Sequence, residues 1–158
     1  SSDLDPKLAS ALEPDGTLRA WKFPEGKMVL NTKVDPKFIT KGAIATLLSD
    51  ANFYYLAFKG SVNANIMPWG DIQSNLMPGN GMRAVPVNGE FYAFERSTGK
   101  MRWHNPVPHQ MVVLDSFNDL PMVLFTSRFH KMIANGQVRN VVQVVAAKAI
   151  DKIGRAHV

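Results

Sequence analysis

Two stretches of the sequence align with each other without a gap. Residues 16–30 read GTLRAWKFPEGKMVL, and residues 89–103 read GEFYAFERSTGKMRW. Each stretch places apolar residues at alternate positions on either side of a glycine-containing turn, which is typical of two short strands joined by a tight turn. The repeat therefore predicts a β-hairpin that the fold uses more than once. The identical residues are Gly16, Ala20, Gly26, Lys27 and Met28 in the first copy and Gly89, Ala93, Gly99, Lys100 and Met101 in the second.

A third, weaker copy lies near the end of the sequence. It runs from Lys148 to Arg155 as KAIDKIGR and is one residue shorter in its turn. The repeat thus occupies residues near 16–31, 89–104 and 147–158. In each copy a small alanine permits close approach of another sheet, and a glycine supplies the backbone freedom that the turn requires. The residues predicted to form this structural motif are Gly16, Ala20, Gly26, Ala93, Gly99 and Trp103.

The second copy resembles the repeat of the PQQ-like β-propellers. In that family an apolar pair, an alanine, a further apolar residue and a polar stretch lead to Thr-Gly-Lys, and a tryptophan follows after two more residues. Here Thr98-Gly99-Lys100 and Trp103 match this pattern. The first copy departs from it, because Glu25 replaces the threonine and Leu30 the tryptophan. The resemblance implies antiparallel four-stranded blades, with the tryptophan packed between neighbouring blades.

The size of the chain bears on how much of a propeller it provides. Propellers close with four to eight blades of about 40 to 45 residues, so 158 residues suffice for about three. We therefore predict a single segment of an incomplete propeller over residues 1–158, completed by missing blades or by other polypeptide chains. The two main copies lie 73 residues apart, which makes residues 61–88 an insertion or places a degenerate blade near Phe53. An antiparallel sandwich with a chance hairpin similarity is the alternative fold.

The remaining sequence predicts mainly strands. Asp5-Pro6 followed by Leu8 and Leu12 predicts a short helix, and residues 38–48 fit a helix or a strand, so the predicted class is all-β with one or two short helices. Residues 138–150 favour a strand over a helix because they are rich in valine. The other predicted strands are residues 52–58 and a meander of four, namely 91–94, 101–103, 111–114 and 122–126, with a turn at Asn105-Pro106.

Composition excludes several classes of protein. The chain has no cysteine, which rules out disulfides, thiolate zinc sites and a cysteine nucleophile. Its net charge of +5 comes from scattered lysines and arginines, so we predict no nucleic-acid partner. The longest apolar runs are far below the roughly 20 residues that span a bilayer, so no transmembrane segment is predicted. A periplasmic or cell-envelope location is implied only by the resemblance.

Residues 61–88 are rich in glycine, proline and asparagine, which predicts a long loop. Long loops in compact domains are commonly functional, and this one carries large apolar side chains that suit an adaptable binding patch. The alternative is that the loop folds back and buries them. The candidate partner-binding residues are Met67, Trp69, Met77 and Met82.

No motif in the chain predicts catalysis. The sequence lacks a nucleophile elbow, a phosphate-binding loop and calcium-ligand spacing, and His104 and His109 form only a weak candidate pair for a metal. We therefore predict no catalytic residue, cofactor or metal. The expected function is a non-enzymatic propeller scaffold or protein-binding platform. The alternative is a fragment of a PQQ-dependent quinoprotein oxidoreductase whose active site lies outside this chain.

Overall fold

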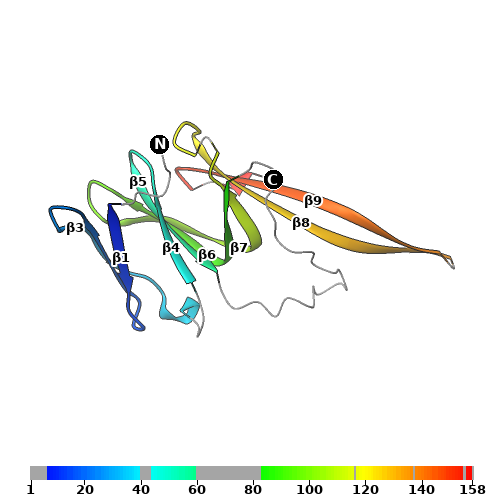
Figure 1. The fold of residues 1–158 in the computed structure, drawn as a ribbon, viewed down its shortest axis with the longest axis horizontal. Coiled ribbons are helices and arrows are strands. Elements are labelled where there is room, and N and C mark those ends of the chain that lie inside the picture. The colour runs from blue at the N-terminus through cyan, green and yellow to red at the C-terminus, as the bar shows by residue number, and fades with distance from the viewer. Residues whose placement is uncertain are drawn as a thin grey trace.

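The structure is a computed structural model that describes residues 7–39, 44–59, 83–115, 117–136, 138–154 and 156–157. These residues form an all-β fold of antiparallel strands in two sheets, with order β1-β2-β3 and β10-β9-β8-β7-β6-β5-β4 (Figure 1). The strands are β1 Leu8–Leu12, β2 Thr17–Lys22, β3 Lys27–Lys33, β4 Ile44–Ser49, β5 Phe53–Lys59, β6 Ala84–Glu95, β7 Met101–Val113, β8 Met122–Asn135, β9 Val138–Asp151 and β10 Ala156–His157.

The repeated stretches form hairpins with the same geometry. In the first, Ala20 pairs with Leu30 and Trp21 with Met28, and a β-bulge interrupts the register between Ala20 and Trp21. In the second, the equivalent Ala93 pairs with Trp103, and the register shifts at the equivalent step to Phe94. The turn glycines Gly26 and Gly99 adopt φ of 68° and 73°, a conformation that favours glycine. The sequence repeat is therefore a structural repeat in strand, bulge and turn.

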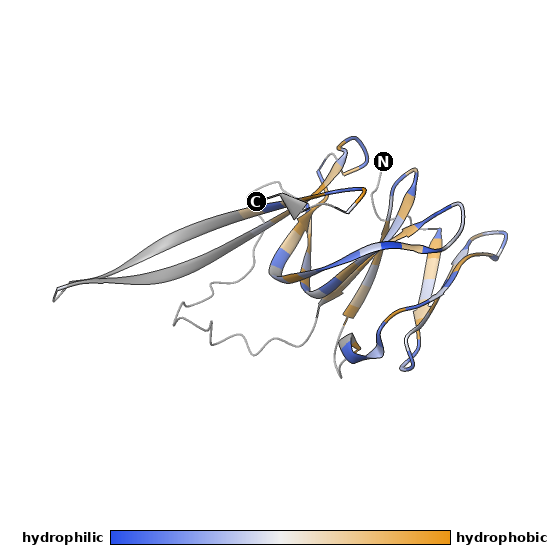
Figure 2. Cartoon of the chain, turned by 180° about the vertical axis from the view of Figure 1, so that it is seen from behind, coloured by the Kyte–Doolittle hydropathy of each residue, from blue (hydrophilic) through white to orange (hydrophobic). Residues whose placement is uncertain are grey.

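Two apolar clusters hold the strands together, and hydrophobic residues lie along the strands of both sheets (Figure 2). In the first cluster, Leu18, Ala20 and Leu30 of the small sheet pack on one face of β5 and β6. The second cluster covers the opposite face of β5 and β6, because the large sheet curls and brings β8 and β9 against it. Aromatic rings fill this second cluster, with the Phe91 ring centroid 5.8 Å from that of Trp103 and 5.2 Å from that of Phe125.

The large sheet has one weakly paired junction. Strands β8 and β9 pair along 14 positions, whereas β7 and β8 pair at Met111–Thr126 and Val112–Phe125 alone. Along the rest of β7 the described residues pair on one side only, with β6. This arrangement accommodates Pro106 and Pro108, because a strand without a second neighbour tolerates residues that cannot donate a backbone hydrogen bond.

Several predicted elements need correction. The predicted N-terminal helix is wrong over its described residues, where Leu8–Leu12 is strand β1. A spacing of four places Leu8 and Leu12 on one face of either a helix or a strand, and pairing with β2 selects the strand. The one helical element among the described residues is the 3-10 turn Pro36–Phe38. The open choice over residues 38–48 is settled for its last five positions, because Ile44–Ser49 is a strand.

The meander contains three strands instead of four. The predicted turn at Asn105-Pro106 is wrong, because β7 runs without a break from Met101 to Val113. Strand β6 begins at Ala84, so the last five positions of the predicted loop 61–88 belong to the sheet. The strands predicted over 52–58 and 138–150 are confirmed. Blades of four strands do not appear as separate sheets, since the described strands form sheets of three and seven.

Candidate functional site

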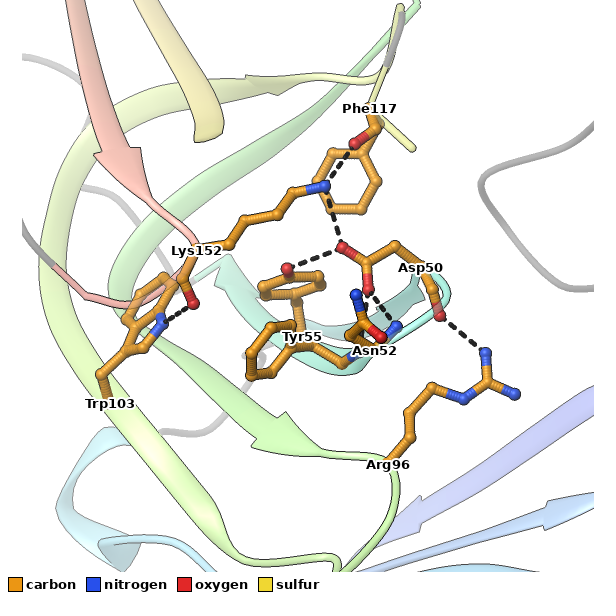
Figure 3. Close-up of polar contacts among 8 residues, drawn as sticks. Asp50, Asn52, Tyr55, Arg96, Trp103, Phe117 and Lys152 are labelled. Atoms are coloured by element: carbon orange, nitrogen blue, oxygen red, sulfur yellow. Dashed lines mark hydrogen bonds and ion pairs between the residues drawn. The ribbon is translucent and has the colours of Figure 1, made fainter. Parts of the chain in front are cut away.

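Three turns of the large sheet meet around one buried carboxylate, Asp50 (Figure 3). Asp50 follows β4, and its side chain is 4% exposed. Its Oδ1 accepts hydrogen bonds from the backbone N–H groups of Asn52, at 2.9 Å, and Phe53, at 2.8 Å. An aspartate that binds the backbone two residues ahead closes a tight turn, and here that turn joins β4 to β5.

The other carboxylate oxygen of Asp50 forms a buried ion pair. Oδ2 lies 2.9 Å from Nζ of Lys152, which stands in the turn after β9, and accepts a hydrogen bond from the Tyr55 hydroxyl at 2.8 Å. Lys152 Nζ also donates to the carbonyl of Phe117 at 2.7 Å and lies 5.1 Å from the centre of the Phe117 ring. One ammonium group therefore joins the β4–β5 turn, the loop after β7 and the turn after β9.

The surroundings fix the charge state of this network. Burial raises the pKa of the Asp50 carboxyl, but the hydrogen bonds from Lys152, the backbone and Tyr55 outweigh it, so the pKa lies below its ordinary value. Burial, together with the nearby Asp50 charge, raises the pKa of the Tyr55 hydroxyl. At neutral pH the carboxylate is thus charged and the phenol is neutral.

Two further side chains bind the backbone of the network. A guanidinium N–H of Arg96 donates to the Asp50 carbonyl at 2.7 Å, and the guanidinium lies 5.0 Å from the centre of the Tyr54 ring. The indole N–H of Trp103 donates to the Lys152 carbonyl at 3.0 Å. These contacts hold the two turns that carry the ion pair.

A hollow of about 510 Å³ opens beside the ion pair. Its lining includes apolar side chains and the carboxylates of Asp119 and Asp151, together with Asp50 and Lys152. A second hollow of about 390 Å³ lies beside the same β4–β5 turn and includes Arg96 and Arg102. The first hollow is lined by residues 50–53, 118–121 and 151–153.

The geometry of the network indicates a structural role and not catalysis. Asp50 receives four donors, two on each oxygen, so it has little capacity left to act as a base. The ammonium of Lys152 is held by two acceptors and is not poised as a nucleophile. Among the residues that the structure describes, no group of three or more His, Asp and Glu side chains is placed to hold a metal ion.

His104 has a buried partner. Its Nδ1 contacts a carboxylate oxygen of Glu90 across β6 and β7, with Glu90 buried and His104 half exposed. The His104 ring also lies against Tyr92, 5.6 Å between ring centres. The side chain of His109, the other member of the weak candidate pair for a metal, is not among the described ones, so the structure does not test that pair.

The predicted site residues fall into two groups. Met67, Trp69, Met77 and Met82 lie outside the described residues. The repeat positions lie in the hairpins, where Ala20 and Ala93 are fully buried and Trp103 is 8% exposed. The ion pair was not predicted, because nothing in the sequence connects Asp50 with Lys152. The local signal was an aspartate three residues before an aromatic strand.

Comparison with known proteins yields no relative: no family model, no curated protein and no solved structure matches the chain. In the part of the chain that is described, no helix is both long enough and apolar enough to cross a membrane. The function is therefore inferred from the repeat and its contacts.

Proposed function

We propose that this chain is a segment of a PQQ-like β-propeller that serves as a non-enzymatic scaffold or protein-binding platform. The described strands form three units. Unit 1 consists of β1–β3, unit 2 of β4–β7 and unit 3 of β8–β10. The sparse pairing between β7 and β8 separates unit 2 from unit 3, and unit 1 is a sheet of its own.

The observation that carries the proposal is a contact that recurs from unit to unit. The residue that closes the first hairpin, Leu30, lies under the turn glycine of the second, where a Cβ on Gly99 would be 3.7 Å from Leu30 Cδ1. Trp103 closes the second hairpin and lies under Gly154, where a Cβ would be 3.0 Å from the Trp103 side chain. Units 1 and 2 thus each place their closing side chain beneath the turn of the next unit.

The faces of the units also pack in a repeating order. Phe94 of unit 2 is buried against the face of unit 1 that carries Leu18 and Ala20. Ile150 holds the position after the alanine in unit 3, as Phe94 does in unit 2, and is buried in the cluster that contains Ala93 and Trp103. Stacking of sheets in one direction, with a short side chain at the closest approach, supports a propeller in preference to a two-layer sandwich.

The polar network supports a structural function for these units. Asp50 lies in unit 2 and Lys152 in unit 3, so the buried ion pair spans their junction. Trp103 of unit 2 makes its hydrogen bond to the same turn of unit 3. The charged groups beside the larger hollow thus hold neighbouring units together, which favours a scaffold over an enzyme.

Hydrogen exchange can test the contact between units. Replacing Leu30 by alanine is expected to cost about 3 kcal/mol of stability, as for other buried leucines, and to reduce protection of the Gly99 amide, which donates to the Glu95 carbonyl at 2.7 Å. Protection should fall locally, at the turn that contains Gly99, because this turn loses the side chain beneath it. Native-state hydrogen exchange detected by NMR measures the protection of the Gly99 amide. The Gly154 amide, measured in the same experiment, is the internal reference.

The matched control is Met28→Ala, on the same strand but with a side chain 46% exposed. It should leave the Gly99 amide unchanged. An equal loss of protection at Gly99 and Gly154 in the Leu30 variant would mean that the contact transmits nothing specific, and the stacking of units would then lose its main support.

A quinone titration separates the scaffold from the oxidoreductase alternative. The chain, incubated with pyrroloquinoline quinone and Ca²⁺ and freed of unbound quinone, is expected to retain no visible chromophore. The physical reason is that Asp50 and Lys152, the charged pair beside the larger hollow, already bind each other and the backbone. Visible absorbance spectroscopy reads the outcome, and stoichiometric retention of the quinone would contradict a cofactor-free scaffold.

A further inference from the structure

We infer that the outward face of unit 1 binds the outward face of unit 3 of a second copy of this chain, so that molecules associate head to tail. This inference rests on the proposed function, because it extends the packing between units to the two ends of the molecule. The small sheet and the β8–β9 hairpin lie at opposite ends of the fold (Figure 1), as head-to-tail association requires.

The outward face of unit 1 is equivalent by the repeat to the faces of units 2 and 3 that pack on the preceding unit, but in unit 1 this face is exposed. Its central residue, Trp21, is equivalent to Phe94 and Ile150, which are fully buried against the preceding unit, whereas Trp21 is partly exposed. Trp21 pairs across the strands with Ala9 and Met28, and Met28 is 46% exposed. The row Ala9, Trp21 and Met28 is therefore an apolar face at the position where other units are covered.

The positions on the strand beside this row repeat the same contrast. Ala9 pairs with Trp21 as Tyr54 pairs with Phe94 and as Val123 pairs with Ile150. Tyr54 and Val123 are buried, but Ala9 is exposed. In units 2 and 3, both residues of this cross-strand pair are buried. In unit 1, Ala9 is exposed and Trp21 is partly exposed.

The outward face of unit 3 provides the complementary surface. Val123, Phe125 and Ile150 point inward to the core, so alternation along the strands places their neighbours on the other face. Leu124 pairs there with Ala149, and Thr126 with Ala147; the four are partly or fully exposed. Ala149 occupies the same repeat position as Ala20 and Ala93, the fully buried alanines on which the next unit packs.

Size complementarity favours a second copy as the occupant. Unit 3 presents the small side chains of Ala147 and Ala149 beside Leu124, and Trp21 and Met28 of unit 1 supply large side chains that suit them. Within the chain, Phe94 shares a cluster with Ala20, and Ile150 shares one with Ala93. A head-to-tail contact of this kind is heterologous, so it closes into a ring or continues as a filament according to its rotation.

Complementary variants test the inference directly. The wild-type chain should sediment above its monomer mass of 17.5 kDa, with a mass that rises with concentration. Trp21→Glu and Leu124→Glu should each be monomeric, because each carries a charge on one of the two faces. An equimolar mixture should form a dimer and nothing larger, since one intact face of each kind remains. Lys27→Glu, at the exposed start of β3, is the control and should associate like wild type.

Other outcomes would overturn the inference. These are a wild-type chain that stays monomeric, a mixture of the two variants that stays monomeric, and self-association of either variant alone, which would indicate a symmetric contact. Circular dichroism of each variant confirms that it is folded. The proposed function is tested separately. The Leu30→Ala experiment probes the contact between Leu30 and Gly99, which lies within one chain, so its outcome does not depend on association.

Discussion

Replacing Lys152 by methionine is expected to lower the free energy of unfolding by about 3 kcal/mol, because it leaves the Asp50 carboxylate buried without its counter-charge. Asp50 keeps the Tyr55 hydroxyl and two backbone donors, but none of these carries a charge. Urea denaturation followed by tryptophan fluorescence measures the change.

Lys148→Met is the matched control, since its ammonium lies in a more exposed position, 3.4 Å from the Pro106 carbonyl. Its effect should stay within about 0.5 kcal/mol, as for other surface substitutions. Combining Lys152→Met with Asp50→Asn should restore part of the loss, because no buried charge then remains. A Lys152 variant as stable as wild type would show that the ion pair contributes nothing to the junction.

The same carboxylate sets a pH dependence with a defined sign. The folded-state pKa of Asp50 is lowered, so its contribution is present above the unfolded-state pKa of about 3.9 and is lost as the pH falls through the folded-state value. The difference in stability between wild type and Asp50→Asn should therefore be constant at neutral pH and shrink below about pH 4.

Replacing Trp103 by alanine is expected to cost about 4 kcal/mol, in the range observed for buried aromatic residues. The indole packs against Phe91 and beneath Gly154, and its N–H binds the Lys152 carbonyl. Trp103→Phe keeps most of the ring and should cost about 1 kcal/mol for the lost hydrogen bond. Urea denaturation, followed here by far-UV circular dichroism, measures both.

Met101→Ala, on the same strand and with its side chain 43% exposed, is the control and should change stability by less than about 0.5 kcal/mol. If Trp103→Ala cost no more than this control, the indole could not be the side chain that holds unit 3 on unit 2.

The sequence allowed the hairpins to be predicted because their determinants are local. Alternating apolar residues and a glycine at the turn specify the first hairpin without reference to the rest of the chain. The strand over Leu8–Leu12 could not be predicted this way, because a spacing of four fits both helix and strand, and its pairing with β2 decides. Strand β7 likewise depends on its partner β6, which holds it extended through Pro106.

The buried network was beyond prediction for a different reason. Asp50, Phe117 and Lys152 come from three turns that are far apart in the sequence, and only the curl of the large sheet brings them together. Asp50 closes the turn before β5 through two local backbone hydrogen bonds. That this turn would also receive an ammonium group requires knowledge of the tertiary fold.

The sparse pairing between β7 and β8 has a consequence for how the molecule responds to its solvent. Within each unit, hydrogen bonds between uncharged backbone groups hold neighbouring strands together, and these bonds do not titrate. At the junction of units 2 and 3 two paired positions remain, and the buried ion pair, the indole hydrogen bond and the apolar cluster supply the other contacts. Protonation of Asp50 removes the ion pair from this set, so acid weakens the attachment of unit 3 to unit 2.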